Sequence, residues 1–81
     1  MVRCADGSLY TGISMDVVRR VAEHNSSNEL AANYTRARRP VILVYQEKQD
    51  TRSAAGKREY AIKQMDRKEK MALIAAASAQ L

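Results

Sequence analysis

The fold is decided at the start of the chain by residues 1–14, which read MVRCADGSLYTGIS. The dipeptide Asp6-Gly7 is the strongest two-residue signal for a β-hairpin, because the tight turn needs positive φ angles that glycine adopts without a steric cost. After this turn, Leu9 and Tyr10 begin an alternation of side chains between two faces, which is typical of a strand. The stretch therefore predicts two short strands joined by a tight turn, over residues 1–5 and 8–14.

Outside this hairpin, the pattern predicts one further strand and three helices. Val41–Tyr45 is a continuous apolar run, which is typical of a central strand covered on both faces. Capping residues and the 3.6-residue spacing of apolar side chains predict helices over residues 16–25, 50–65 and 67–77. Residues 26–40 are polar and predict a loop with one helical turn at residues 30–32.

Three details of these helices can be tested directly. Val17, Val18 and Val21 share one arc of the first helix, and we expect that arc to face the core. Arg58 falls in the middle of the apolar arc of the second helix, which the pattern does not explain. The third helix follows the residues Asp66-Arg67-Lys68-Glu69, which predict a capping box.

The length and composition predict one α/β (α+β) domain over residues 1–81, with a small three-stranded mixed sheet flanked by helices. Hydrophobic residues are 46% and charged residues 28% of the chain, which excludes a collagen-like or disordered protein. A single cysteine excludes an internal disulfide and a multi-cysteine zinc site. The chain shows neither a membrane-spanning run nor a secretory signal, so we expect a cytoplasmic protein without a membrane partner or a small-molecule cofactor.

The positive charge is concentrated in the second part of the chain. The whole chain has a net charge of +5, but residues 34–70 contain eleven basic and five acidic side chains, a net of +6. A basic region on a small domain favours a polyanionic partner, most often a nucleic acid. The alternative is a solvated surface that keeps the protein in solution, and the charge alone does not separate the two.

Four side chains remain as candidates for chemistry once the common motifs are excluded. The sequence has no phosphate-binding loop and no dinucleotide-binding glycine motif, and its single histidine excludes a two-histidine site. Tyr10 or His24 can remove a proton from water, and Arg20 can stabilise charge on phosphate oxygens. Glu59 can hold a hydrated Mg²⁺, which needs only one or two protein carboxylates. These residue types suit the cleavage of a phosphodiester.

Each candidate also has an ordinary structural interpretation. Tyr10 can be a strand tyrosine, and Arg20 can be a solvated helix arginine. His24 can interact with the C-terminal end of its helix, where a cation is favourable. Glu59 can form a surface ion pair with Lys63, worth about 0.3–0.5 kcal/mol. Composition and spacing alone therefore leave both interpretations open.

The order of these residues resembles the GIY-YIG nuclease family. The resemblance extends over residues 2–74. The chain looks most like the small stand-alone bacterial members, whose chains are little more than the nuclease domain. It implies a small sheet flanked by helices and metal-dependent cleavage of DNA. The matching segments are Leu9–Ile13, Asp16–Arg20, His24-Asn25, Tyr34–Arg36, Arg38–Pro40, Lys57–Glu59 and Ile62-Lys63.

The resemblance implies a role for each matching residue. Tyr10 would be the general base, Arg20 would contact the phosphate, and His24 would position the tyrosine or the phosphate. Glu59 would hold the metal, Mg²⁺ or Mn²⁺. The candidate substrate-binding residues are Tyr34 and Arg36, which match a loop near the site, and Arg38 and Arg39 in the basic region.

The sequence departs from the family pattern at the first motif. That motif supplies a tyrosine in the first strand, and its position here falls just before Met1. We therefore expect a truncated first strand and a site without that hydroxyl, either because the chain begins upstream or because it is a shortened form.

The sequence leaves three functional hypotheses. The first is a metal-dependent DNA endonuclease, with a role in repair or recombination. The second is a non-catalytic module that binds nucleic acid through Arg36, Arg38 and Arg39 and whose affinity falls steeply with salt. The third is a protein-interaction domain, which only the Ala-rich segment 71–81 favours.

Overall fold

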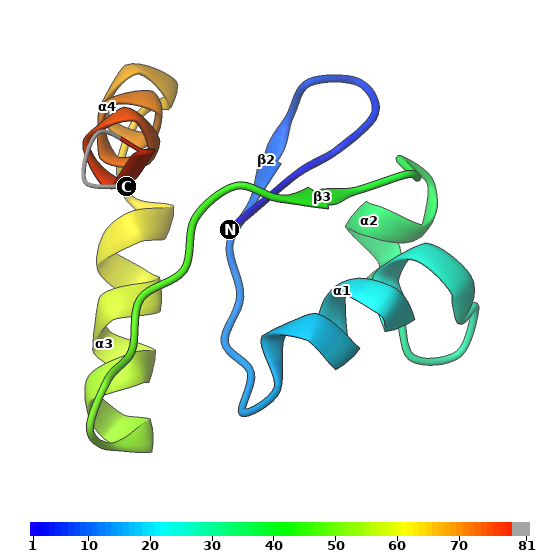
Figure 1. Cartoon of the computed structure of the whole chain (residues 1–81), viewed down its shortest axis with the longest axis horizontal. Helices are drawn as coiled ribbons and strands as arrows, with labels where there is room; N and C mark the ends of the chain where they lie inside the picture. Colours follow the sequence, from blue (N-terminus) through cyan, green and yellow to red (C-terminus); the bar gives the residue numbers. More distant parts are fainter. Residues whose placement is uncertain (79–81) are drawn as a thin grey trace.

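The computed structural model describes residues 1–78, which form one small antiparallel sheet and four helices (Figure 1). β1 (Val2–Arg3) lies in the middle of the sheet, between β2 (Leu9–Tyr10) and β3 (Ile42–Leu43). Val2 pairs with Tyr10 on one side and with Leu43 on the other. The α+β class and the three-stranded sheet predicted from the sequence are confirmed. The last three residues of the Ala-rich segment lie outside the described part.

A turn forms at Asp6-Gly7 as predicted, but only Gly7 has a positive φ angle and both strands are shorter than the ranges 1–5 and 8–14. Gly7 has a φ angle of 85°, in the region that favours glycine. The Cys4 N–H donates to the Ser8 carbonyl at 2.8 Å, which closes the hairpin. The Asp6 carboxylate accepts hydrogen bonds from both the N–H and the hydroxyl of Ser8. These bonds fix the register that places Tyr10 opposite Val2.

The expectation of a mixed sheet is wrong, because both strand pairs are antiparallel. β2 and β3 run in the same direction, as a helical crossover between them favours, but β1 lies between them and neither pairs with the other. The expectation that Val41–Tyr45 is a central strand covered on both faces is also wrong. Val41 is buried, but Ile42 and Leu43 form an edge strand and are exposed.

The helices agree closely with the predicted ranges. α1 (Val17–Ser26) begins at Asp16, whose carboxylate accepts from the Arg19 N–H at 3.0 Å. α3 (Arg52–Lys63) begins at Thr51, whose hydroxyl oxygen accepts from the Ala54 N–H at 3.0 Å.

The last helix and the short helix of the loop region complete the set. α4 (Arg67–Ser78) begins with the predicted capping box, in which Asp66 and Glu69 each accept from the other's N–H. The short helix α2 is formed by Asn33–Arg36. The sequence predicts the helical turn at residues 30–32, so the observed helix begins directly after the predicted range. No helix of the described residues is long and apolar enough to cross a membrane.

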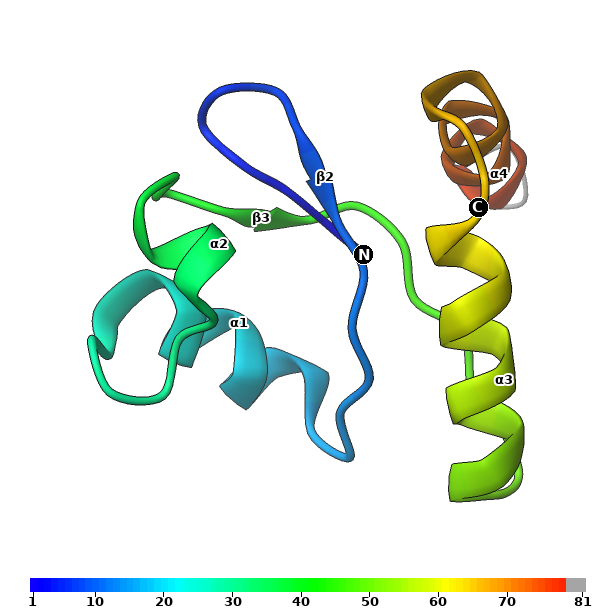
Figure 2. The ribbon, with the colours of Figure 1, turned by 180° about the vertical axis from the view of Figure 1, so that it is seen from behind.

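The core is small and lies between the hairpin and α1. Val2, Cys4 and Val41 form its buried centre, and Tyr10 and Val21 pack against it. Val18 is 80% exposed, so the expectation that it faces the core is wrong. α1 and α2 lie on one side of the molecule, and α3 and α4 lie on the opposite side of the sheet region, as both views show (Figures 1 and 2).

Candidate active site

A cleft of about 1100 Å³ separates these two sides, and all four candidate catalytic residues line it. Tyr10 comes from β2, Arg20 and His24 come from α1, and Glu59 comes from α3. Residues that are far apart in the sequence therefore meet at one concave surface. Because a cleft with convergent polar groups is the usual form of a binding or active site, this surface is the candidate site.

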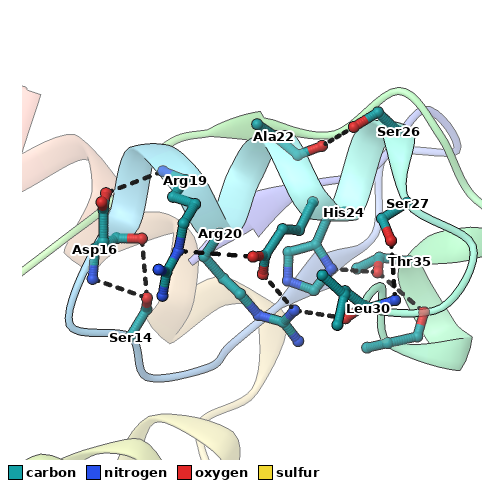
Figure 3. Close-up of polar contacts among 12 residues, drawn as sticks. Ser14, Asp16, Arg19, Arg20, Ala22, His24, Ser26, Ser27, Leu30 and Thr35 are labelled. Carbon is teal, nitrogen blue, oxygen red and sulfur yellow. Dashed lines mark hydrogen bonds and ion pairs between the residues drawn. The ribbon is translucent and has the colours of Figure 1, made fainter.

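His24 lies at the base of the cleft and is 4% exposed. Its Nδ1 atom is 2.6 Å from the hydroxyl oxygen of Thr35, a fully buried residue of α2 (Figure 3). Burial, together with the positive charges of Arg20 and Arg39, holds the pKa of His24 below its usual value of 6.5. The imidazole is therefore neutral near pH 7 and can accept a proton.

Tyr10 is held by aromatic neighbours on two sides. The edge-to-face contact with His24 has a centroid distance of 5.6 Å, and the stacked contact with Tyr34 has a distance of 5.8 Å. The Arg38 guanidinium lies over the ring of Tyr34, 3.9 Å from the ring centroid. The ring of Tyr10 is thus fixed by its neighbours, in a position that lines the cleft.

Arg20 is oriented by two acceptors at the rim of the cleft. Its Nη1 atom donates to the Leu30 carbonyl at 2.6 Å and to the Glu23 carboxylate at 3.2 Å (Figure 3). Its Nε and Nη2 atoms form no hydrogen bond with any other described residue. Since a guanidinium can use its remaining N–H groups as a fork, Arg20 can hold an anion while it stays anchored to the protein.

Glu59 lines the opposite wall of the cleft and pairs with Lys63 at 3.6 Å, as the sequence allowed. Its side chain is 24% exposed, so the carboxylate can reach solvent and a ligand. Within residues 1–78, no cluster of three acidic, histidine or cysteine side chains could hold a metal by itself. A single accessible carboxylate fits Mg²⁺ or Mn²⁺ only in a hydrated form that shares its coordination with a substrate phosphate.

Sequence reasoning missed a second polar group on the same wall. The Glu47 carboxylate accepts from the Arg58 Nε at 2.7 Å, and it also accepts from the Tyr45 hydroxyl. Hydrogen bonds from Tyr45 and Arg58 outweigh the effect of burial and hold the pKa of Glu47 below 4.5. The position of the charged Arg58 in the apolar arc of α3 was the only indication of this contact in the sequence.

The arginines expected to contact substrate lie outside the cleft lining and are bonded within the protein. Arg39 donates to the carbonyl oxygens of His24 and Ser27, at 2.6 and 2.7 Å, and to Asn28 Oδ1 at 2.9 Å. Arg36 donates to the Asn28 carbonyl and to Asn33, and Arg38 pairs with Asp6. With these three bonds in place, Arg39 keeps two N–H groups, but it lies outside the cleft lining.

Comparison with known proteins gives a consistent result. The family model described as the GIY-YIG catalytic domain matches residues 1–72. The chain is 57% identical over 76 residues to a UPF0213 protein of Desulfotalea psychrophila, which covers 94% of this chain and 68% of the relative. UPF0213 proteins of Staphylococcus saprophyticus and Staphylococcus aureus are 54% identical over 74 residues, covering 91% of this chain and 88% of each relative. No solved structure gives a significant match.

Proposed function

Because this chain belongs to the GIY-YIG nuclease family, we propose that it is a metal-dependent endonuclease that hydrolyses phosphodiester bonds in DNA. The observation that supports this proposal best is the shared cleft. Tyr10, Arg20, His24 and Glu59 come from three different elements and line one surface. A base, a phosphate-binding cation and a metal-binding carboxylate are the groups that phosphodiester hydrolysis requires.

In this proposal each residue acts through chemistry that its surroundings allow. Tyr10 removes a proton from the attacking water as its own hydroxyl proton passes to neutral His24, which lies against its ring. Arg20 donates its free N–H groups to the phosphate oxygens, where negative charge increases during the attack. Tyr34 stacks on Tyr10 and keeps the phenol in place.

Glu59 is the residue that would hold Mg²⁺ or Mn²⁺. When bound, the metal would neutralise charge on the phosphate and on the leaving oxygen. The chain itself supplies the single carboxylate on α3 and the donor groups on the facing wall. Arg36 and Arg38 would extend the phosphate contacts outside the cleft through N–H groups that their present hydrogen bonds do not use.

The proposal is tested by cleavage of end-labelled single-stranded, duplex and branched DNA with Mg²⁺ or Mn²⁺. We expect cleavage that a chelator abolishes and that Glu59→Gln reduces by about 100-fold or more. Glu29→Gln is the matched control, because it makes the same charge change on an exposed loop residue outside the cleft. A Glu59→Gln variant that cuts DNA as fast as the parent would disprove the assignment.

A different outcome would support the second hypothesis. If the parent binds DNA with a strong salt dependence but cuts none of the substrates in either metal, the protein is a binding module. A role in DNA repair or recombination and a cytoplasmic location remain parts of the nuclease proposal. Cleavage confined to branched DNA would favour the repair or recombination role.

A further inference from the structure

Thr35 makes the only described contact to the Nδ1 atom of His24. The hydroxyl oxygen of Thr35 is 2.6 Å from that atom and 3.1 Å from the Ala32 carbonyl oxygen (Figure 3). Thr35 is fully buried in α2, so water does not compete for these contacts. The hydroxyl therefore has one proton for two contacts, and the Ala32 carbonyl also accepts from the Arg36 N–H at 2.9 Å.

These two contacts favour one of the two neutral tautomers of His24, the one in which both contacts are hydrogen bonds. A hydroxyl donates one hydrogen and accepts through two lone pairs. If Nδ1 has the proton, the ring donates to Thr35 and Thr35 donates to Ala32, so both contacts are hydrogen bonds. If Nε2 has it, Thr35 must donate to Nδ1, and the contact with Ala32 has no hydrogen left. We infer that Thr35 is a positioning residue that holds neutral His24 in the Nδ1–H tautomer, with the Nε2 lone pair directed to the cleft.

The Nε2 atom is accessible from the cleft. It forms no hydrogen bond with any of the residues described. Across residues 1–78, the buried side-chain nitrogen or oxygen that lacks a partner is Thr11 Oγ1, so Nε2 is not sealed inside the protein. Since His24 lines the cleft, Nε2 is open to a ligand there.

The sequence left two roles open for His24, positioning the tyrosine or positioning the phosphate, and this tautomer distinguishes them. This step of the inference rests on the proposed nuclease function. A lone pair at Nε2 repels a phosphate oxygen, but it accepts a hydrogen bond from a hydroxyl, either the Tyr10 phenol or a water molecule. The proton that leaves this hydroxyl moves to Nε2, and the imidazolium retains its Nδ1–H bond to Thr35. His24 therefore assists proton removal instead of holding the phosphate.

The charged and titratable groups around His24 come from each element packed against it. They are Tyr10 on β2, Arg20 and Glu23 on α1, and Arg39 before β3. Two of the three charged groups are cations, which oppose protonation of the ring. The neutral form that the tautomer argument needs is therefore the form expected at neutral pH.

The tautomer can be measured without any nuclease activity. His24 is the single histidine, so protein labelled with ¹⁵N-histidine gives one imidazole pattern in a long-range ¹H–¹⁵N correlation spectrum. We expect the Nδ1–H pattern in the parent and in Thr35→Ser, which keeps the hydroxyl. Thr35→Val removes the hydroxyl with little change of shape and should shift the population toward Nε2–H. An Nε2–H pattern in the parent, or an unchanged tautomer in Thr35→Val, would overturn the inference.

The effect on catalysis is the second test. We expect Thr35→Val to lower kcat by about 10- to 100-fold with little change in KM, and to move the acidic limb of the pH profile. Thr35→Ser should restore most of the rate, whereas a loss that serine does not restore would overturn the role of the hydroxyl. If the parent shows the Nδ1–H pattern but cuts no DNA, the tautomer assignment stands and the proposed nuclease function fails.

Discussion

Two buried threonines differ in whether their hydroxyls have partners, and the same substitution should affect them in opposite ways. Thr11 is 6% exposed and its hydroxyl has no partner, whereas the Thr35 hydroxyl contacts His24 and Ala32. Thr11→Val should raise the free energy of unfolding by about 1 kcal/mol, because it removes an unsatisfied polar group. Thr35→Val should lower it by about 1–3 kcal/mol, because it leaves the buried Nδ1 atom of His24 without its partner.

Urea denaturation of the parent and the two variants measures this contrast. The two variants serve as controls for each other, because the side-chain change is identical and both sites are buried. If Thr11→Val destabilised the protein as much as Thr35→Val, the hydroxyl of Thr11 would have a partner in solution.

His24 should make stability depend on pH in a predictable direction. Because burial lowers its pKa in the folded state, the unfolded chain binds more protons below pH 6.5. Stability is therefore fully present above this value and decreases as the pH falls through the lowered pKa of the folded state. Titration of the single imidazole by NMR should give a pKa below 6.5, and a value at or above 6.5 would contradict the prediction.

A matched variant isolates this effect from other titrating groups. In His24→Gln the same denaturation series, from pH 7.5 to pH 5, should lose the part of the slope that His24 contributes. Glu47 and Asp6 have pKa values held below 4.5 and 3.8, so they titrate at lower pH. Equal slopes in the parent and the variant would show that His24 titrates normally in the folded state.

At the scale of single residues, the sequence indicated which candidate side chains line the cleft better than it indicated their partners. Tyr10, Arg20, His24 and Glu59 were identified from their types and order, and all four line the cleft. Thr35 lies in the matching segment Tyr34–Arg36, but the sequence indicated no role for it, because a threonine in a polar stretch does not reveal its partner. Its importance arises from a contact between α1 and α2 that only the fold creates.

At the scale of elements, the Arg39 side chain forms hydrogen bonds at the C-terminal end of α1. Its guanidinium donates to the carbonyl oxygens of His24 and Ser27 and to Asn28, and so satisfies acceptors at the C-terminal end of α1. Arg39→Gln should lower the free energy of unfolding by about 1.5–3 kcal/mol, because hydrogen bonds to a charged group are lost. Arg36→Gln, an exposed change nearby, should cost less than about 1 kcal/mol.

Thermal unfolding combined with DNA binding at low salt distinguishes this structural role from a substrate contact. We expect Arg39→Gln to melt at a lower temperature and, below that temperature, to bind DNA nearly as well as the parent. An unchanged melting temperature with weaker DNA binding would instead make Arg39 a phosphate ligand.

The helices were predictable from the sequence because their signals are local. Asp16, Thr51 and the pair Asp66 and Glu69 form the caps that their residue types indicate. The strands were less predictable, since the apolar run at residues 41–45 does not reveal which positions the helices will cover. Val41 packs in the core, whereas Ile42 and Leu43 remain exposed at the edge of the sheet.

At the scale of the whole molecule, the site depends on how α3 is held across the cleft. Ile62 is the one buried side chain that is described in α3 and α4. Polar contacts add to it: Glu47 pairs with Arg58, and Arg67 donates to the Gly7 carbonyl at 2.9 Å. The closely packed pairs of elements are α1 with α2 and β1 with its two neighbours. The wall that presents Glu59 is therefore attached through few contacts.

This arrangement predicts that α3 can be loosened while the rest of the fold persists. Ile62→Ala should lower the free energy of unfolding by about 2–4 kcal/mol, because it deletes buried methyl groups. We expect mainly α3 to be destabilised. Ile42→Ala is the matched control, since Ile42 is 49% exposed and lies on the edge strand.

Hydrogen exchange should become faster for amides of α3 than for amides of β1 and α1. The His24 imidazole pattern should stay unchanged, while the proposed DNA cleavage falls because Glu59 is no longer held in the wall of the cleft. If exchange instead became faster equally in all elements, α3 and the sheet would unfold as one unit, and the cleft would be a fixed feature of the molecule.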